Sequence, residues 1–277
     1  MDQFDTVRQE QEDLLYRGWK YAGVIILLGL LILVTTLVLL FIGETSHLLI
    51  LVKVLAPLSP FFLGVVGLSI FGRESLVKED RFHALNVWIA LGLVVFSLSE
   101  FAGVILHVVG SAEILFMIGL IQLPALMLWG LGVLGYLRAS NSALGVAAEG
   151  FWIRVILITT IATLVIVVLE VLFIPNRSII ELGVSILMVI VLGIILIALG
   201  RLLWVLRSGL IARPLTLLFL GVMLFLIRNL FWNFFTYAPD LPFDYVTAIE
   251  SYILIGGSLL ASSSLEEVFN LVEEVEE

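Results

Sequence analysis

Long apolar stretches recur through almost the whole sequence and leave little room for a water-soluble domain. Hydrophobic residues make up 61% of the chain and charged residues 13%, which is more apolar surface than one soluble core can bury. Eight stretches have roughly the 20 residues that a helix needs to cross hydrocarbon. The sequence therefore predicts an all-α polytopic membrane protein, a bundle of eight transmembrane helices at residues 21–42, 47–71, 85–109, 113–137, 152–174, 180–206, 214–237 and 245–262.

The basic residues alternate across this predicted topology. With the N-terminus in the cytoplasm, the outer loops hold only Arg177, and Lys53 and Arg228 fall within spans. Cytoplasmic loops carry an excess of Lys and Arg, so both termini are expected on the cytoplasmic side of the cell membrane. Merging or splitting a span would scramble this alternation. The residues assigned to the cytoplasmic side are Arg8, Arg17, Lys20, Arg73, Lys78, Arg81, Arg138, Arg154, Arg201, Arg207 and Arg213.

The same topology divides the chain into three parts. We expect a cytoplasmic N-terminal tail at residues 1–20, an eight-helix transmembrane domain at 21–263 and an acidic amphipathic C-terminal tail at 264–277. No cleavable signal peptide is expected, because a long acidic segment precedes the first apolar run and that run is too long for a signal sequence.

The transmembrane domain also suggests an internal duplication. The halves at residues 21–138 and 151–263 would each contain four helices and start on the same side, so they would be parallel repeats. Glu100 and Arg228 are separated by the same spacing as Gln122 and Glu250. Chance matches are common in a chain so rich in Leu, Ile and Val, and the duplication remains one of two readings.

Polar side chains inside the predicted spans are the features most informative about function. A charge at mid-bilayer costs a few kcal/mol, so such groups usually face inward and are paired. With a helical rise of about 1.5 Å per residue, the predicted topology places all of them in the outer half of the membrane, as expected for one cavity or network. They are Glu100, Gln122, Glu170, Arg228, Asn229, Asn233, Glu250 and His107, with Lys53 near a helix end.

Three interpretations of this polar layer remain open. Buried ion pairs and amides often hold helices together without binding any ligand. The same groups could line a pathway for a solute or ion, or a pocket that senses a small molecule. The acids Glu100, Glu170 and Glu250 outnumber the bases Arg228 and Lys53. One carboxyl is therefore expected to lack a charged partner, which is what a proton-coupled carrier needs.

The sequence contains few of the patterns that accompany enzymes and cofactors. It has no cysteine, and His47, His83 and His107 do not form the helical spacings of zinc, di-iron or haem ligands. Nucleophile and phosphate-binding motifs are missing, and no lysine lies deep in the last two spans. We therefore expect no enzyme, metal or cofactor; an intramembrane lipid enzyme that uses carboxylates alone is the weakest alternative.

The C-terminal tail shows helical spacing of apolar residues. Leu265, Val268, Phe269, Val272 and Val275 recur on one face, and glutamates occupy the other. An acidic face disfavours binding to lipid surfaces and to nucleic acid. The tail is therefore expected to pack on the protein's own basic loops or to dock a cytoplasmic protein partner.

Two functions follow from these features. The first is a small-solute or ion transporter, or channel-like permease, in which Glu100 and Glu250 coordinate the substrate or ion. Arg228 would be their counter-charge, and Asn229 and Asn233 would orient the site. The alternative is a non-catalytic membrane sensor or scaffold that acts through its cytoplasmic tails.

Overall fold

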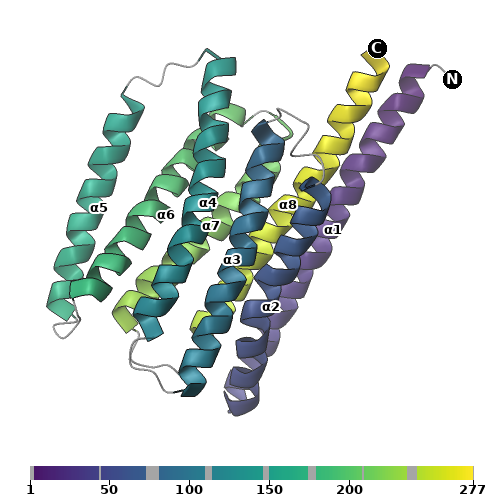
Figure 1. The fold of residues 1–277 in the computed structure, drawn as a ribbon. Helices are drawn as coiled ribbons and strands as arrows, with labels where there is room; N and C mark the ends of the chain where they lie inside the picture. The colour runs from purple at the N-terminus through teal and green to yellow at the C-terminus, as the bar shows by residue number, and fades with distance from the viewer. Residues whose placement is uncertain are drawn as a thin grey trace.

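The computed structural model contains eight helices and no strand among the residues it describes, so the all-α prediction is confirmed. The described residues are 3–43, 45–72, 81–109, 114–145, 150–173, 179–207, 209–235 and 242–276. The helices are α1 (Gln3–Phe41), α2 (Thr45–Phe71), α3 (Arg81–Val109), α4 (Ile114–Ala143), α5 (Phe151–Phe173), α6 (Ile179–Leu206), α7 (Ala212–Phe235) and α8 (Pro242–Glu276) (Figure 1).

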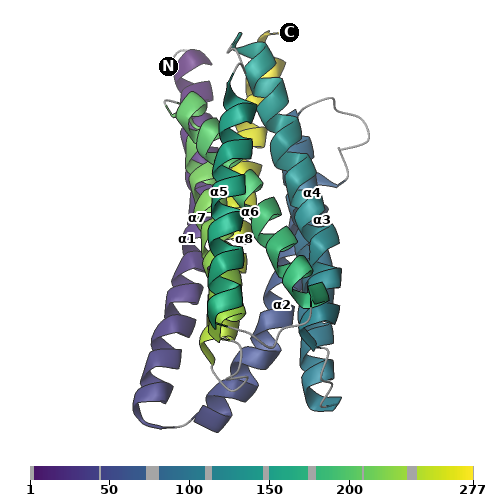
Figure 2. The same cartoon turned by 90° about the vertical axis from the view of Figure 1, so that its left-hand side faces the viewer.

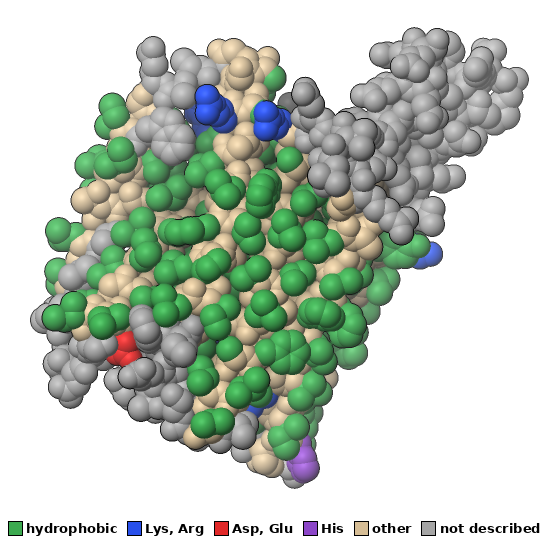
Figure 3. Space-filling view, in the orientation of Figure 1, with side chains coloured by type: hydrophobic (Ala, Val, Ile, Leu, Met, Phe, Trp, Pro, Cys, Tyr) green, Lys and Arg blue, Asp and Glu red, His purple; other side chains and the backbone are tan. Residues whose placement is uncertain are grey.

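Seven of these helices are long and apolar enough to cross a membrane, by length and composition. The exception is α5, whose described apolar stretch is the shorter segment Ile153–Ala162. Hydrophobic side chains cover most of the described surface on the face shown in Figure 3. A multi-pass membrane bundle is thus confirmed for seven helices, and the crossing by α5 stays a prediction.

Both chain termini lie at the same end of the bundle (Figure 1). We call this the termini end, where α1 begins and α8 ends; at the far end, α1 ends and α8 begins. Figure 3 shows basic side chains along the edge of the termini end. Which side of the membrane this end faces stays a prediction. The basic residues with described side chains in the half of each helix nearest to this end, or just beyond it, are Lys20, Arg81, Arg138, Arg154, Arg201, Arg207 and Arg213.

Helix α8 occupies the centre of the packing, and α1 and α5 lie at its margins. α8 contacts α1, α2 and α7 extensively and α3 less so, whereas α5 packs mainly on α6 (Figures 1 and 2). In the membrane-spanning part of α8, 78% of the residues are buried, against 11% in α1. Because α8 packs on α1 and α2, the two predicted halves interleave; whether they are repeats stays a prediction.

Close approach of α1 and α8 depends on a glycine. A Cβ atom on Gly18 would overlap the hydroxyl group of Ser264, so only glycine allows this separation of the two backbones. Gly23, five residues further along α1 and on another side of the helix, has nothing within 4 Å of its Cβ position. The α1–α8 interface therefore follows one side of α1, and the other side faces outward.

An aromatic cluster joins α3, α4, α7 and α8 in the middle of the bundle. It consists of Phe96, Trp129, Phe225 and Tyr252, with ring centroids 4.6–5.9 Å apart in the pairs that touch. The indole N–H of Trp129 donates to the carbonyl oxygen of Ile89 at 3.1 Å, which satisfies its only polar atom. These rings pack against the polar site described below.

The first and last helices run through the expected domain boundaries. The backbone of α1 is helical from Gln3 and that of α8 as far as Glu276, although their membrane-spanning parts are Gly18–Phe41 and Asp244–Leu265. The apolar face expected in the C-terminal tail involves side chains that lie outside the described set, apart from Leu265.

Candidate functional site

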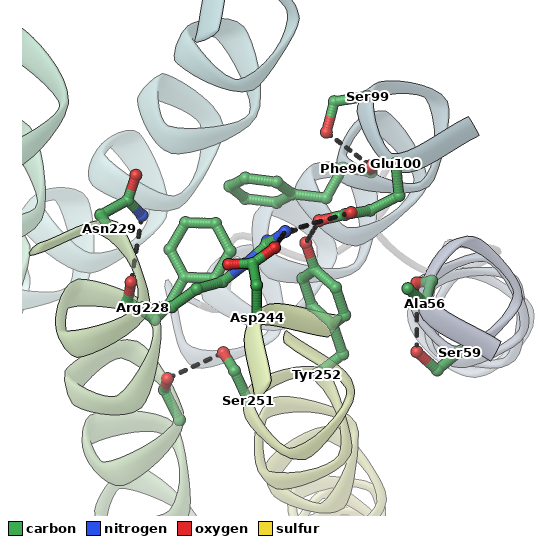
Figure 4. A network of polar contacts seen from close by, with 12 residues as sticks. Ala56, Ser59, Phe96, Ser99, Glu100, Arg228, Asn229, Asp244, Ser251 and Tyr252 are labelled. Atoms are coloured by element: carbon green, nitrogen blue, oxygen red, sulfur yellow. Dashed lines mark hydrogen bonds and ion pairs between the residues drawn. The ribbon is translucent and has the colours of Figure 1, made fainter. Parts of the chain in front are cut away.

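Arg228 of α7 lies between two carboxylates that come from different helices (Figure 4). Its Nη1 and Nη2 donate to the two carboxylate oxygens of Glu100 in α3, at 2.6 and 3.2 Å. Its Nε and Nη2 donate to the two oxygens of Asp244 in α8, at 3.0 and 3.1 Å. The hydroxyl of Tyr252 donates to Glu100 Oε1 at 2.7 Å. We call these four residues the Arg228 network.

The guanidinium geometry explains why a single arginine can join three helices. Its donors point in two directions in one plane, and each direction matches the two oxygens of a carboxylate. Glu100 and Arg228 are almost fully buried, with 5% and 8% of their side chains exposed, and Asp244 is 16% exposed. The network therefore links α3, α7 and α8 in a largely dry environment.

The aromatic cluster provides one wall of the network. The Cζ atom of Arg228 lies 5.6 Å from the ring centroid of Phe225, one turn earlier in α7. Tyr252 belongs to both groups, because its ring packs on Phe96 and Phe225 while its hydroxyl bonds Glu100. A cation over an aromatic face is attracted by the ring, so the aromatic cluster also stabilises the charged guanidinium.

Comparison with protein families, curated proteins and solved structures finds no match to this sequence or to this fold. The interpretation of the site therefore depends on its geometry alone.

Glu250 lies on a different face of α8 from the Arg228 network. A Cβ atom on Gly29 of α1 would approach Glu250 Oε2 to 2.8 Å, so this carboxyl points at the backbone of α1. Its other oxygen, Oε1, is buried and has no hydrogen-bond partner among the described residues. Glu250 and Tyr252 are two positions apart, about 200° around a helix, and this explains why one faces α1 while the other faces α3.

Two amide side chains of the predicted set are buried but are not part of the network. Asn229 follows Arg228 in α7, and its Nδ2 donates to the carbonyl oxygen of Phe225 at 3.0 Å. This bond stabilises its own helix. Gln122 is buried in α4, with 5% of its surface exposed.

Three predicted residues lie in described helices, but their side chains are outside the described set. They are His107 in α3, Glu170 in α5 and Asn233 in α7. The structure therefore brings Glu100 and Arg228 together and places Glu250 apart.

Sequence reasoning missed two members of the network. Asp244 precedes the predicted eighth span, 245–262, by one residue, but α8 begins at Pro242. Proline in the first turn followed by an acidic residue is a common start of a helix, so this signal was present. Tyr252 gave no such signal, because a tyrosine within an apolar run is usually a packing residue.

A proline in α2 leaves a backbone carbonyl without its helical hydrogen bond. Pro60 has no N–H, so the carbonyl oxygen of Ala56 lacks its usual helical donor. The hydroxyl of Ser59 approaches this oxygen at 3.4 Å, and Figure 4 shows this contact away from the network.

No group of three or more His, Asp or Glu side chains is arranged to hold a metal ion among the residues that the structure describes.

Proposed function

We propose that this protein is a multi-pass membrane permease for an ion or small solute, with both termini in the cytoplasm and eight spans. The observation that carries the proposal is the buried Oε1 atom of Glu250 in a membrane-spanning helix, which has no hydrogen-bond partner among the described residues. A buried acceptor without a donor costs about 1–3 kcal/mol, and more when it is charged. Uptake of a proton or a small cation lowers that cost by neutralising the carboxylate, and reversible uptake is the step that a coupled carrier requires.

The Arg228 network has a different role in this proposal. Both oxygens of Glu100 and of Asp244 already accept hydrogen bonds from Arg228. The network is therefore a clamp that holds α3, α7 and α8 at a fixed separation, and Glu100 is not an open coordinating acid. Of the three acids with described side chains in α3 and α8, Glu250 is therefore the one proposed to exchange an ion.

The position of α1 supports access to Glu250. α1 is the least buried of the seven apolar helices, and Gly29 in this helix lies directly against the carboxyl. Glu250 as a whole is already partly exposed, and a small displacement of α1 relative to α8 would open its buried oxygen without breaking the Arg228 network.

Flux measurements in vesicles test the proposal. The purified protein is reconstituted into liposomes, and movement of protons, Na⁺ and K⁺ is followed with ion-sensitive dyes. We expect wild-type flux for at least one ion, and at least a tenfold loss in Glu250→Gln. Glu181→Gln, which changes an acid near the start of α6, serves as the matched control and should retain flux. Absence of flux for every ion, or unchanged flux in Glu250→Gln, would contradict the proposal.

A second function, a non-catalytic scaffold or sensor, is favoured by the terminal helices. Residues 18–264 contain twelve acidic and twelve basic side chains, so the net charge of -9 belongs entirely to residues 1–17 and 265–277. The backbones of α1 and α8 continue as helices into both segments at the termini end. An acidic pair of helices attached to the bundle suits a cytoplasmic partner with a basic surface.

Deletion of the residues after Ser264 tests this second function. If the tail docks a partner, the deletion abolishes co-purification of that protein while circular dichroism and elution volume of the membrane domain stay the same. Retention of every co-purifying protein by the truncated chain would exclude a docking role for the tail.

A further inference from the structure

Two arginines and one tryptophan are spaced along the last turns of α6. Arg201, Trp204 and Arg207 are spaced three residues apart, which places them along one ridge of the helix and its end. The Cζ atom of Arg207 lies 5.0 Å from the ring centroid of Trp204. The Cζ atom of Arg201 lies 5.8 Å from the ring centroid of Phe151, the first residue of α5. We call this feature the α6 basic ridge.

The α6 basic ridge lies at the depth of a lipid headgroup. Arg201 is five residues from the end of the apolar helix Ile179–Leu206, or about 7 Å along its axis. Trp204 is 67% exposed, although a tryptophan that faces water over so much of its surface is costly. Exposed tryptophan is favoured at the boundary between lipid and water, so its position marks that boundary on α6.

The ridge also carries cationic groups that have no matching acid among the described side chains. The Nε atom of Arg201 is buried and has no hydrogen-bond partner among the described residues, while the side chain as a whole is only partly buried. The acids whose side chains are described are Glu100, Glu181, Asp244 and Glu250, and none of them lies in the terminal turns at this end of the bundle. The described ridge is therefore positively charged.

We propose that the α6 basic ridge binds the phosphate headgroup of an anionic phospholipid. Guanidinium groups bind phosphate through paired, charge-assisted hydrogen bonds, and basic pockets between transmembrane helices are suited to anionic headgroups. Arg201 supplies the deeper donors beside Phe151, and Arg207 the shallower ones, held by stacking on Trp204. This site is independent of any flux through Glu250.

Lipid retention by the purified protein tests the site. Native mass spectrometry compares phosphatidylglycerol with phosphatidylcholine of the same acyl chains, and thermal unfolding is followed with each lipid. We expect preferential retention of phosphatidylglycerol and a higher unfolding temperature in its presence. Arg201→Gln and Arg207→Gln should each weaken that binding about tenfold, the effect of losing one charge-assisted hydrogen bond.

The controls separate a lipid site from general attraction between charges. Lys20→Gln removes an exposed positive charge at the same end of the bundle, on α1, and should leave the lipid preference unchanged. Arg207 follows the end of α6, so its variant reports on binding even where Arg201→Gln lowers the yield of folded protein. Equal retention of the two lipids, or equal losses in Lys20→Gln and Arg207→Gln, would overturn the proposal. Binding of inorganic phosphate as tight as that of phosphatidylglycerol would also overturn it, in favour of a soluble anion.

Discussion

At the scale of single residues, the shared guanidinium makes substitutions in the Arg228 network unequal. Removing Arg228 leaves the carboxylates of Glu100 and Asp244 buried together without a cation. Removing the charge of Glu100 leaves Arg228 paired with Asp244 through two hydrogen bonds. An isolated buried charge destabilises the folded state much more than a buried ion pair stabilises it. Loss of Arg228 should therefore destabilise the protein more than loss of either acid.

We therefore predict that Arg228→Gln lowers the free energy of unfolding by about 3–5 kcal/mol. Glu100→Gln should cost less, about 1–3 kcal/mol, because the amide oxygen can still accept a hydrogen bond. Unfolding by a denaturing detergent in mixed micelles measures both values. Arg213→Gln, which changes an exposed arginine in the same helix, should change stability by less than about 1 kcal/mol. Equal costs for Arg228→Gln and Glu100→Gln would contradict the shared geometry.

The tyrosine of the network allows a more conservative change. Tyr252→Phe keeps the ring in the aromatic cluster and removes only the hydroxyl that donates to Glu100. A hydrogen bond to a charged group contributes about 1.5–3 kcal/mol, and we expect a loss of stability in that range under the same conditions. Tyr21→Phe, at an exposed position of α1, is the control and should be neutral. No change in Tyr252→Phe would mean that this bond does not stabilise the protein.

The sequence could predict the depth of the polar residues but not the direction in which each one faces. The depth of a residue in the membrane follows from its position along a span. This predicts a common depth for Glu100 and Arg228, and the two side chains do form hydrogen bonds. Direction depends on which helices are neighbours, because every span is apolar almost all round and no face stands out. For this reason Glu250 was grouped with Arg228, although it faces Gly29 in α1.

At the scale of helices, the α1–α8 pair shows how a lipid-facing helix is held in place. There is no gain from removing apolar surface from water inside a bilayer, so close backbone packing provides the attraction. Gly18, at the overlap with Ser264, is the point where this packing is tightest. The apolar runs predicted the existence of these helices, but the start of α8 was placed at Tyr245 because hydropathy ignores the cap at Pro242.

We predict that Gly18→Leu separates α1 from α8, whereas Gly23→Leu does not. Both changes raise helix propensity equally, but only the first meets Ser264; overpacking of this kind costs about 1–3 kcal/mol. Because the chain has no cysteine, the pair Ile26→Cys and Gly257→Cys can report the separation through disulfide formation. The cross-link should form more slowly with Gly18→Leu only. Equal rates in both backgrounds would show that α1 is not held at this glycine.

At the scale of the whole molecule, an even number of crossings places the two termini on one side. The described helices show the termini at one end of the bundle (Figure 1), and most described basic residues lie near that end. The chain's charges predicted this segregation, because basic residues are retained on the cytoplasmic side. The crossing by α5 is the step on which the count of eight depends.

Single cysteines introduced on either side of α5 test that count. Leu144→Cys follows α4, and Ile179→Cys begins α6; both positions are exposed. If α5 crosses the membrane, a membrane-impermeant maleimide added to intact cells labels only Ile179→Cys. Tyr16→Cys, near the N-terminus, should become labelled together with Leu144→Cys after permeabilisation. Labelling of Leu144→Cys and Ile179→Cys on the same side would reduce the topology to seven crossings.

The central position of α8 has a consequence for the order in which the protein is made. Among the seven apolar helices, α1 has the highest mean hydropathy and α8 the lowest. α1 emerges first from the ribosome and can remain in lipid alone, whereas α8 emerges last and brings Asp244 and Glu250 into the membrane. Arg228 and Glu100 are made before α8. Asp244, the first acid of α8, can therefore pair with Arg228 as soon as α8 enters the bilayer. A nascent chain that stops before α8 therefore leaves α1 without its principal helix contact.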